Sequence, residues 1–291
     1  LYLNAEVYTG TPRYQDAMTQ IQLVINEGGY ALTTDFKSLF SGDNNVTAAK
    51  NEIIYALIAD PITSQSYGNT TYLVNGSLSA DTMTLSNYGA TAGWGGHRST
   101  KAWYGLFGNS ATELAASSDV RAQLFWTQGH SYEMNDYKIW TDGYPCVKFR
   151  NLNAVGTSIA TDFSGTDFPL FRLADTYLMY AECVLRGATN GTSGQALQYV
   201  NAVRSRANAA PISAGDLNLN FILDERGREL NFEGHRRSDL IRFGKFAGGS
   251  YVWPWKGGVK EGTAIPEHYN LYPIPLKAMQ ANPNLTQNPG Y

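Results

Sequence analysis

Apolar residues recur at helical spacing in two separated parts of the chain. Each set forms one face of a predicted helix, because its members lie three or four residues apart. The two sets are Ala17, Ile21, Val24 and Ala196, Val200, Val203. Each predicted helix follows an apolar stretch that ends in Ala-Glu, at Ala5-Glu6 and at Ala181-Glu182. The pattern therefore predicts the same helical hairpin twice.

Small alanines at the positions where two helices meet are typical of tetratricopeptide-like pairs. We therefore expect a mostly α fold built on such hairpins. Repeats of this kind seldom perform chemistry and more often hold other surfaces in place. The search for a functional site then moves to the segment between the two hairpins, residues 30–168.

The hydrophobic rhythm changes inside this segment. Residues 52–58 read as a strand, and shorter strands are expected near 124–126 and 147–149. Residues 59–93 are rich in Ser, Thr, Asn and Gly and are expected to form a long polar loop, a feature that is often functional. Further helices are predicted from 173 to 187, 193 to 208, 221 to 230 and 237 to 243.

These elements predict one domain over residues 1–291, with residues 30–168 as a large insertion of loops and short strands between the hairpins. The chain starts inside a helix-like pattern with no cap before Leu1. We therefore expect the chain to be a fragment that lacks an N-terminal part.

Composition narrows the class of ligand. Charged residues make up 16% of the chain and the net charge is −3, so nucleic acid is not an expected partner. No apolar run is long enough to span a membrane. The 19 tyrosines and 6 tryptophans suit either a protein that binds sugars or other neutral ligands, or a large aromatic core.

The most charged stretch is predicted to be structural. Glu225 and Glu229 lie on one helix face, and Arg226 and Arg228 lie beside them. Carboxylates paired with cations have lowered pKa values and are poor proton shuttles at neutral pH. No nucleophile or metalloprotease motif is present, and Cys146 and Cys183 are expected to be buried free thiols. We expect no enzyme and no required cofactor.

Two aromatic residues of the insertion, Tyr67 and Trp94, are candidate ligand contacts. Both stand next to glycine, and a ring with small neighbours can remain exposed and stack on a sugar, with Asn69 beside it for the hydroxyls. The alternative is that both rings are buried anchors of their loops. Asp43 and Asn45 have the oxygen ligands that Ca²⁺ prefers, but a plain Asx turn explains them as well.

Several long motifs resemble the SusD/RagB family, and together they cover essentially the whole chain. They are Phe168-Pro169-Leu170-Phe171-Arg172-Leu173-Ala174-Asp175-Thr176-Tyr177-Leu178-Met179-Tyr180-Ala181-Glu182, Phe232-Glu233-Gly234-His235-Arg236-Arg237-Ser238-Asp239-Leu240, and the closing Asn282-Pro283-Asn284-Leu285. The Tyr67 and Trp94 loops are similar to the starch-binding branch of this family.

The resemblance implies a lipid-anchored protein on the outer face of the outer membrane in Bacteroidetes. Such proteins bind glycans without cleaving them and pass them to a TonB-dependent transporter. In the starch-binding branch an arc of aromatic side chains cradles the glucan, and Tyr67, Asn69 and Trp94 lie where part of that arc is expected. Calcium, reported for some members, would fall at Asp43 and Asn45. The lipid anchor would belong to the missing N-terminal part.

Two other functions remain open at this point. A helical scaffold that only contacts a transporter would bind no sugar. A glycosidase would need two suitably spaced acids, and residues 60–100 contain only Asp60 and Asp81.

Overall fold

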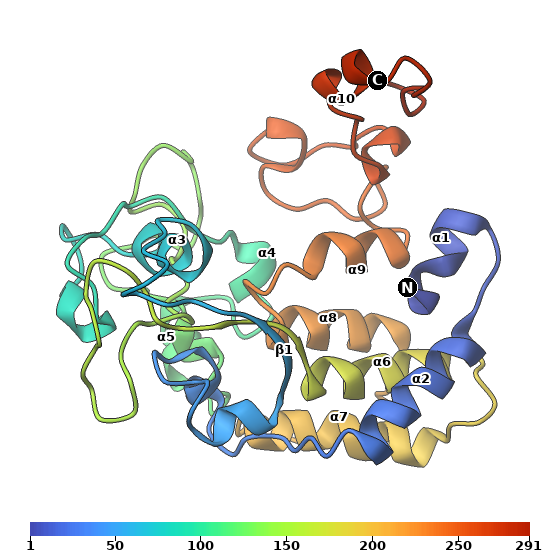
Figure 1. The fold of residues 1–291 in the computed structure, drawn as a ribbon, viewed down its shortest axis with the longest axis horizontal. Coiled ribbons are helices and arrows are strands. Elements are labelled where there is room, and N and C mark those ends of the chain that lie inside the picture. The colour runs from blue at the N-terminus through green and yellow to red at the C-terminus, as the bar shows by residue number, and fades with distance from the viewer. The chain divides into compact units, whose positions relative to one another are not determined.

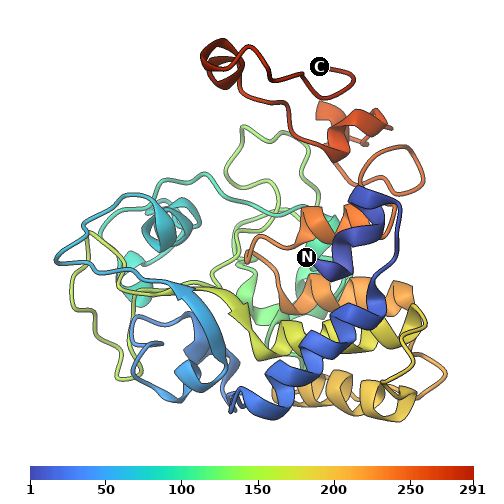
Figure 2. The same ribbon diagram turned by 45° about the vertical axis from the view of Figure 1, so that its right-hand side comes forward.

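The computed structural model describes residues 1–291 and divides into two compact units, unit 1 (residues 1–235) and unit 2 (residues 236–291). The chain is mostly helical, with one two-stranded sheet (Figure 1, Figure 2). The helices and strands of unit 1 are α1 Ala5–Thr9, α2 Tyr14–Glu27, β1 Ile53–Leu57, α3 Asn69–Gly76, α4 Lys101–Tyr104, α5 Ala111–Ala116, β2 Phe168–Arg172, α6 Leu173–Leu185, α7 Ser193–Arg206 and α8 Leu219–Glu229. Its 3-10 turns are η1 Tyr2–Asn4, η2 Phe36–Phe40, η3 Ala48–Asn51, η4 Leu85–Tyr88 and η5 Ala122–Leu124.

Helix α6 is the centre of the helical frame of unit 1, because it packs against α2, α7 and α8 (Figure 1). Ala17, Ala181 and Ala196, the small residues that predicted the hairpins, are all buried. Small side chains let the helices approach closely, so the predicted hairpin is confirmed in α6 and α7. The leading helix of the first copy is short, since η1 and α1 end at Gly10 with a φ of 71°.

The two-stranded sheet pairs a segment inside the insertion with the segment at its end. Strands β1 and β2 are antiparallel, with Ile53 opposite Arg172 and Leu57 opposite Phe168. The prediction of a strand at 52–58 is therefore confirmed. Strand β2 was not expected, and it leads directly into α6, so the sheet joins the insertion to the helical frame.

Three sequence predictions for the insertion were wrong or incomplete. No strands form at 124–126 or 147–149, where only an isolated bridge joins Phe125 and Cys146. Helix α3 lies within the stretch that was expected to be entirely loop. The insertion instead folds around its own aromatic core, which includes Phe36, Phe40, Tyr104 and Phe149. Cys146 and Cys183 are buried and form no disulfide, as predicted.

A buried network of ion pairs ties the insertion to the helical frame. Arg172 on β2 binds Glu52 before β1 at 3.0 Å and Glu233 at 2.6 Å, and Arg206 on α7 binds Glu52 at 2.8 Å. Arg121 in the insertion binds Glu225 at 2.9 Å and Glu229 at 2.8 Å, both on α8.

The network confirms one of the partners expected for the two glutamates of α8 and corrects the other. Arg228 binds Glu225 at 2.8 Å, as expected, but Arg226 pairs with Asp175 instead. Glu229 is also bound by Arg172 and Arg206. Burial alone would raise the pKa of Glu229, but the surrounding arginines hold that pKa far below its ordinary value. Both glutamates therefore stay ionised, and their predicted structural role is confirmed.

Unit 2 contains α9 Arg236–Arg242, η6 Lys256–Gly258, η7 Glu267–Asn270 and α10 Leu276–Ala281. Its loops are held by cations over aromatic rings. The Nζ of Lys256 lies 4.5 Å from the Trp253 ring centre and donates to the Gly248 carbonyl at 2.8 Å. The Arg237 guanidinium lies 4.0 Å from the Tyr272 ring centre. None of the helices in the chain is long and apolar enough to cross a membrane.

Candidate functional site

Three aromatic rings of the insertion form a continuous exposed surface, which we call the Trp94 cluster: Tyr67, Tyr72 and Trp94. The exposed fractions of these side chains are 66%, 53% and 42%. Trp94 lies between the tyrosines, with ring centres 6.3 Å from Tyr67 and 6.1 Å from Tyr72. The planes are tilted by 55° and 51°, so the surface is curved rather than flat.

Helix α3 positions both tyrosines, since Tyr67 precedes its first residue and Tyr72 lies in its first turn. Two buried threonines fix this helix to the segment before β2. The Thr70 hydroxyl donates to the Thr166 carbonyl at 2.6 Å, and the Ser164 amide donates to the Thr71 hydroxyl at 2.9 Å. Helix α3 is therefore held by polar contacts in addition to its apolar residue Val74.

The Trp94 loop is attached to the end of α3 by main-chain hydrogen bonds. The amide of Trp94 donates to the Asn75 carbonyl at 2.8 Å, and the amide of Gly95 donates to the Leu78 carbonyl at 2.8 Å. Gly95 has a φ of 59°, a conformation that glycine adopts without steric cost. These bonds fix the main chain of Trp94 beside α3, and its indole then contacts both tyrosine rings.

Two further rings support the cluster from the side. The Phe163 ring centre lies 4.9 Å from that of Tyr67, and the His97 ring centre lies 4.5 Å from that of Tyr72. Burial lowers the pKa of His97, so its imidazole is neutral at pH 7. The cluster therefore offers ring faces and no ionised group of its own, an arrangement suited to a neutral ligand.

Asn69 lies between Tyr67 and Tyr72 in the sequence, and its side-chain amide makes a hydrogen bond within the protein. Asn69 is the first residue of α3 and is exposed, with a φ of 52°. Its Nδ2 donates to the Ile58 carbonyl at 3.4 Å, which is a long hydrogen bond. Its Oδ1 has no partner within the protein and remains available as an acceptor.

The two expected calcium ligands, Asp43 and Asn45, differ in their burial and contacts. Asp43 Oδ2 accepts the Ala154 amide at 2.9 Å, and Asn45 is exposed while its neighbour Asn44 is buried. Asp43 Oδ1 is buried without a partner, but Glu52, the next carboxylate along the chain, is bound to Arg172 and Arg206. No group of three or more His, Cys, Asp or Glu is arranged to hold a metal. The Asp43 loop therefore has the contacts of an Asx-rich turn, and a calcium ion at Asp43 and Asn45 stays a prediction.

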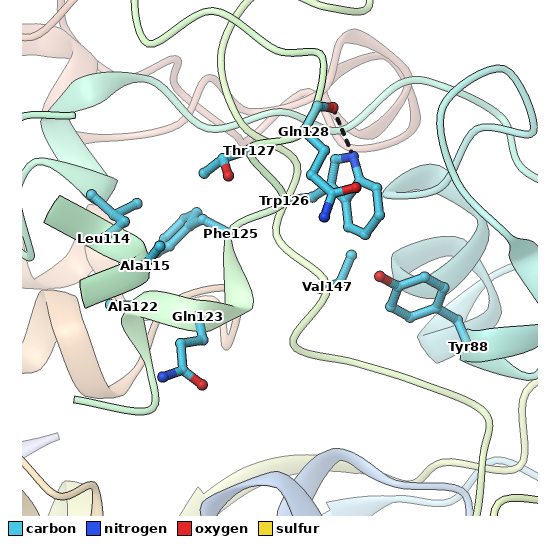
Figure 3. A pocket seen from close by; sticks show the side chains of 10 residues that line it. All are labelled: Tyr88, Leu114, Ala115, Ala122, Gln123, Phe125, Trp126, Thr127, Gln128 and Val147. Atoms are coloured by element: carbon cyan, nitrogen blue, oxygen red, sulfur yellow. Dashed lines mark hydrogen bonds between the residues drawn. The ribbon is translucent and has the colours of Figure 1, made fainter. Parts of the chain in front are cut away.

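A separate cavity of about 350 Å³ lies in the insertion, and Figure 3 shows the side chains that line it. No charged residue and no member of the Trp94 cluster belongs to this lining. The indole N–H of Trp126 donates to the Gln128 carbonyl at 3.1 Å, drawn as the dashed line in Figure 3. Because its largest ring is half-buried and tied to its own loop, the cavity presents less stacking surface than the Trp94 cluster.

Sequence reasoning named Tyr67 and Trp94 and missed Tyr72, Phe163 and His97. Tyr72 stands outside any glycine-rich motif, and its neighbour Trp94 is distant in sequence. Only the prediction of a helix over 69–76 would have placed Tyr72 on the same surface as Tyr67.

Comparisons with known proteins agree on one family. Residues 121–291, more than half of the chain, match the model described as the SusD family. The chain is 32% identical to the starch-binding protein SusD of Bacteroides thetaiotaomicron over 331 aligned positions, with all of this chain and 58% of that protein covered. The chain thus spans less than two thirds of this relative.

Solved structures show the same fold. A SusD superfamily protein from Parabacteroides distasonis is 25% identical, with a TM-score of 0.69 and coverage of 100% of this chain and 60% of the other. Surface glycan-binding protein A from Bacteroides thetaiotaomicron, in complex with laminarihexaose, is 22% identical with a TM-score of 0.69, covering 99% and 62%. The buried alanine-faced hairpin, the motifs around Arg172 and Glu233 and these matches lead to one conclusion: the chain belongs to the SusD family.

Proposed function

We propose that the Trp94 cluster binds a neutral glycan, and that the glycan is an α-glucan of the starch type. The observation that carries the proposal is the exposure of three adjacent rings, at 66%, 53% and 42%. The similarity to a starch-binding protein over the whole chain supports the choice of glucan. The tilt of 51° to 55° between neighbouring rings also suits a chain that curves as it passes over them.

The binding energy comes from the apolar faces of the sugar rings. Burying such a face against an aromatic ring removes apolar surface from water, at about 25 cal/mol per Å². The Asn69 Oδ1 and the Tyr67 and Tyr72 hydroxyls would satisfy hydroxyl groups that lose their water. A few such contacts give weak affinity for one segment, and a polymer that meets many copies of the protein is held by multivalency.

The wider role follows from the family and rests on the same proposal. The chain would work at the cell surface on the outer leaflet of the outer membrane, tethered by a lipid on a part that precedes it. It would deliver oligosaccharides to a TonB-dependent transporter and would not cleave them. The best-paired acids of the chain, Glu225 and Glu229, are fully buried in ion pairs, which supports binding rather than hydrolysis.

The test replaces the central ring of the cluster. We expect Trp94→Ala to weaken binding to soluble starch about tenfold or more, because it removes both a stacking face and its neighbours' support. Tyr8→Ala is the matched control, since Tyr8 is 56% exposed in α1, far along the chain from the cluster. Retardation in affinity gels containing the polysaccharide measures the effect, and thermal unfolding shows whether the fold is kept.

The result that contradicts the proposal is equal retardation of Trp94→Ala and the unchanged chain. Isothermal titration with malto-oligosaccharides and laminari-oligosaccharides then decides between functions. Heat with maltoheptaose supports the α-glucan, heat only with laminarihexaose moves the specificity to β-glucans, and no heat with either favours a scaffold that only contacts a transporter.

Metal removal is the second test. We expect EDTA to leave both glycan retardation and the unfolding temperature unchanged, because the contacts of the Asp43 loop are those of an Asx-rich turn. Restoration of binding by added Ca²⁺ after EDTA treatment would contradict this expectation.

A further inference from the structure

Two arginines at the junction of the insertion and the helical frame converge on one carboxylate oxygen. Arg204 Nη1 and Arg228 Nε lie 2.7 Å and 2.8 Å from Glu225 Oε2. Their other bonds go to main-chain carbonyls: Arg204 Nε to Ala210 at 2.8 Å and Arg228 Nη1 to Leu106 at 3.3 Å. These bonds use only the Nε and Nη1 atoms of each arginine, and the Nη2 group of each has no acceptor within the protein. An arginine carries five N–H donors, so both have donors left for a ligand.

The buried ion network contains one more cation than it has carboxylates. Its cations are Arg121, Lys148, Arg172, Arg204, Arg206 and Arg228, and its carboxylates are Asp119, Glu52, Glu225, Glu229 and Glu233. The side chains of Arg121 and Arg206 are only 1% and 3% exposed, whereas those of Arg204 and Arg228 are each 13% exposed. The surplus positive charge therefore reaches solvent at Arg204 and Arg228.

Both arginines line a cavity of about 240 Å³ together with Ser117, Ser118 and Asp119. The Ser118 hydroxyl has no partner in the protein, and the Ser117 hydroxyl oxygen accepts the Asp119 amide at 3.2 Å, which leaves its proton free to be donated. The two carboxylate oxygens of Asp119 are occupied by Arg121, at 2.9 Å and 2.7 Å. The cavity is smaller than the roughly 300 Å³ at which pockets begin to take drug-sized ligands.

We infer that this cavity binds a small oxoanion: a carboxylate, sulfate or phosphate group. Two guanidinium groups fixed by a shared carboxylate offer N–H donors in the planar, paired geometry that suits such a group. The hydroxyls of Ser117 and Ser118 supply further donors. Because the arginines are already ordered by Glu225, an anion would bind without fixing two flexible side chains first. The inference does not depend on the glycan proposed for the Trp94 cluster.

The test uses the full chain and inorganic sulfate as the probe. We expect a saturable heat on titration of sodium sulfate, with sodium chloride at matched ionic strength as the reference. Ser118→Asp places a carboxylate beside the two arginines and is expected to abolish this heat. Ser118→Asn, with nearly the same shape and no charge, is the matched control and is expected to retain it. Sulfate also stabilises proteins generally by exclusion from their surface, and that effect is the same in both variants.

A second variant removes one donor. Arg228→Gln is expected to weaken sulfate binding about tenfold or more, the loss that follows from one charge-assisted hydrogen bond. Because Arg228 also holds Glu225, circular dichroism checks its fold, and the Ser118 pair decides the question if this variant does not fold. The inference is overturned if sulfate and chloride give equal heats, or if Ser118→Asp binds sulfate as the unchanged chain does.

Two further titrations assign the source of the anion. Both titrations use the Trp94→Ala chain, so that the aromatic cluster does not contribute. If glucuronate binds more tightly than acetate and glucose gives no heat, the anion is a sugar acid. Equal binding of glucuronate and acetate identifies a free carboxylate.

Discussion

The glycines around Trp94 differ in what their missing side chains would meet. A Cβ added at Gly93 would lie 2.8 Å from the Leu78 carbonyl carbon and oxygen, which are main-chain atoms that cannot rotate away. At Gly96 the nearest atom to an added Cβ is the Gly76 carbonyl oxygen at 3.8 Å, an ordinary contact. The approach of the loop to the residues after α3 therefore depends on Gly93 and not on Gly96.

We predict that Gly93→Ala weakens glycan binding and lowers the unfolding temperature, because the loop must move away from Leu78 and carries Trp94 with it. Gly96→Ala is expected to change neither quantity appreciably. Affinity gels and thermal unfolding of the two variants, measured side by side, check the prediction. Equal behaviour of the two alanine variants would show that the indole position does not depend on the close approach at Gly93.

At this scale the sequence predicted part of the site. Glycine neighbours indicated that the rings of Tyr67 and Trp94 stand exposed, and they do. Tyr72 has no glycine neighbour to indicate its exposure. It lies beside Trp94 because the main-chain amides of residues 94–97 donate to the carbonyls of Asn75, Gly76 and Leu78. The carbonyls that accept these bonds are present whatever side chains positions 75, 76 and 78 carry, so nothing in the sequence marks them as partners.

Helix α3 shows how an element can be held in place without a strong apolar face. It contains two buried threonines and a buried Asn75, and its only buried hydrophobic side chain is that of Val74. Its contacts to residues 164–166 replace the apolar stripe that identifies most amphipathic helices. Residues 69–76 therefore lack the apolar spacing of an amphipathic helix, and we predicted a loop there from the sequence.

We predict that Thr70→Val lowers the free energy of unfolding by about 1–3 kcal/mol, since the Thr166 carbonyl would lose its buried donor. Thr112→Val, at an exposed position of α5, is the matched control and is expected to have a small effect. Urea unfolding measures both. A Thr70→Val chain as stable as the control would mean that water replaces the lost hydroxyl.

Strand β2 was missed for a related reason. Phe168–Arg172 becomes a strand because β1 pairs with it across the insertion, and a partner that far along the chain is invisible to local pattern. The helices α2 and α7 were predicted well, because each buries one face and shows it as regular apolar spacing. Helices α6 and α8 were also predicted, although α6 is buried on most sides and the buried residues of α8 include Glu225 and Glu229.

In unit 1 the buried ion network stabilises the contact between the insertion and the helices, a role that an apolar interface has in many proteins. Arg172 alone contacts Glu52, Glu229 and Glu233, which come from three different segments. A buried charge that loses its partner costs far more than an exposed one, because water cannot reach it. The loss of a single member of the network is therefore expected to destabilise the contact between the insertion and the helices strongly.

We predict that Arg172→Met lowers the free energy of unfolding by about 3–5 kcal/mol, the cost of breaking a buried ion pair from one side. Arg13→Met is the matched control, because Arg13 forms an exposed pair with Asp16 at 2.7 Å that water and salt screen. It is expected to change stability very little. Denaturant unfolding distinguishes the two, and similar losses in both variants would contradict the prediction.

The same network predicts the response to acid. Burial would raise the pKa values of Glu225 and Glu233, but neighbouring cations lower both below the ordinary value. A carboxylate with a lowered pKa stabilises the folded state above its unfolded pKa, about 4.3, and that contribution is lost as pH falls further. We expect the urea midpoint to be steady from pH 7 to about pH 5 and to fall steeply below pH 4. A midpoint unchanged at pH 3 would contradict this.

The attachment of residues 94–97 through main-chain atoms has a consequence for how the protein can change over time. The carbonyls that receive these residues belong to positions 75, 76 and 78, and a carbonyl is present whatever side chain the position carries. The bonds that hold the loop therefore do not depend on which side chains stand at 75 and 78. A lineage could retune which saccharide it prefers by exchanging the rings at 67 and 72, while the loop geometry is inherited unchanged.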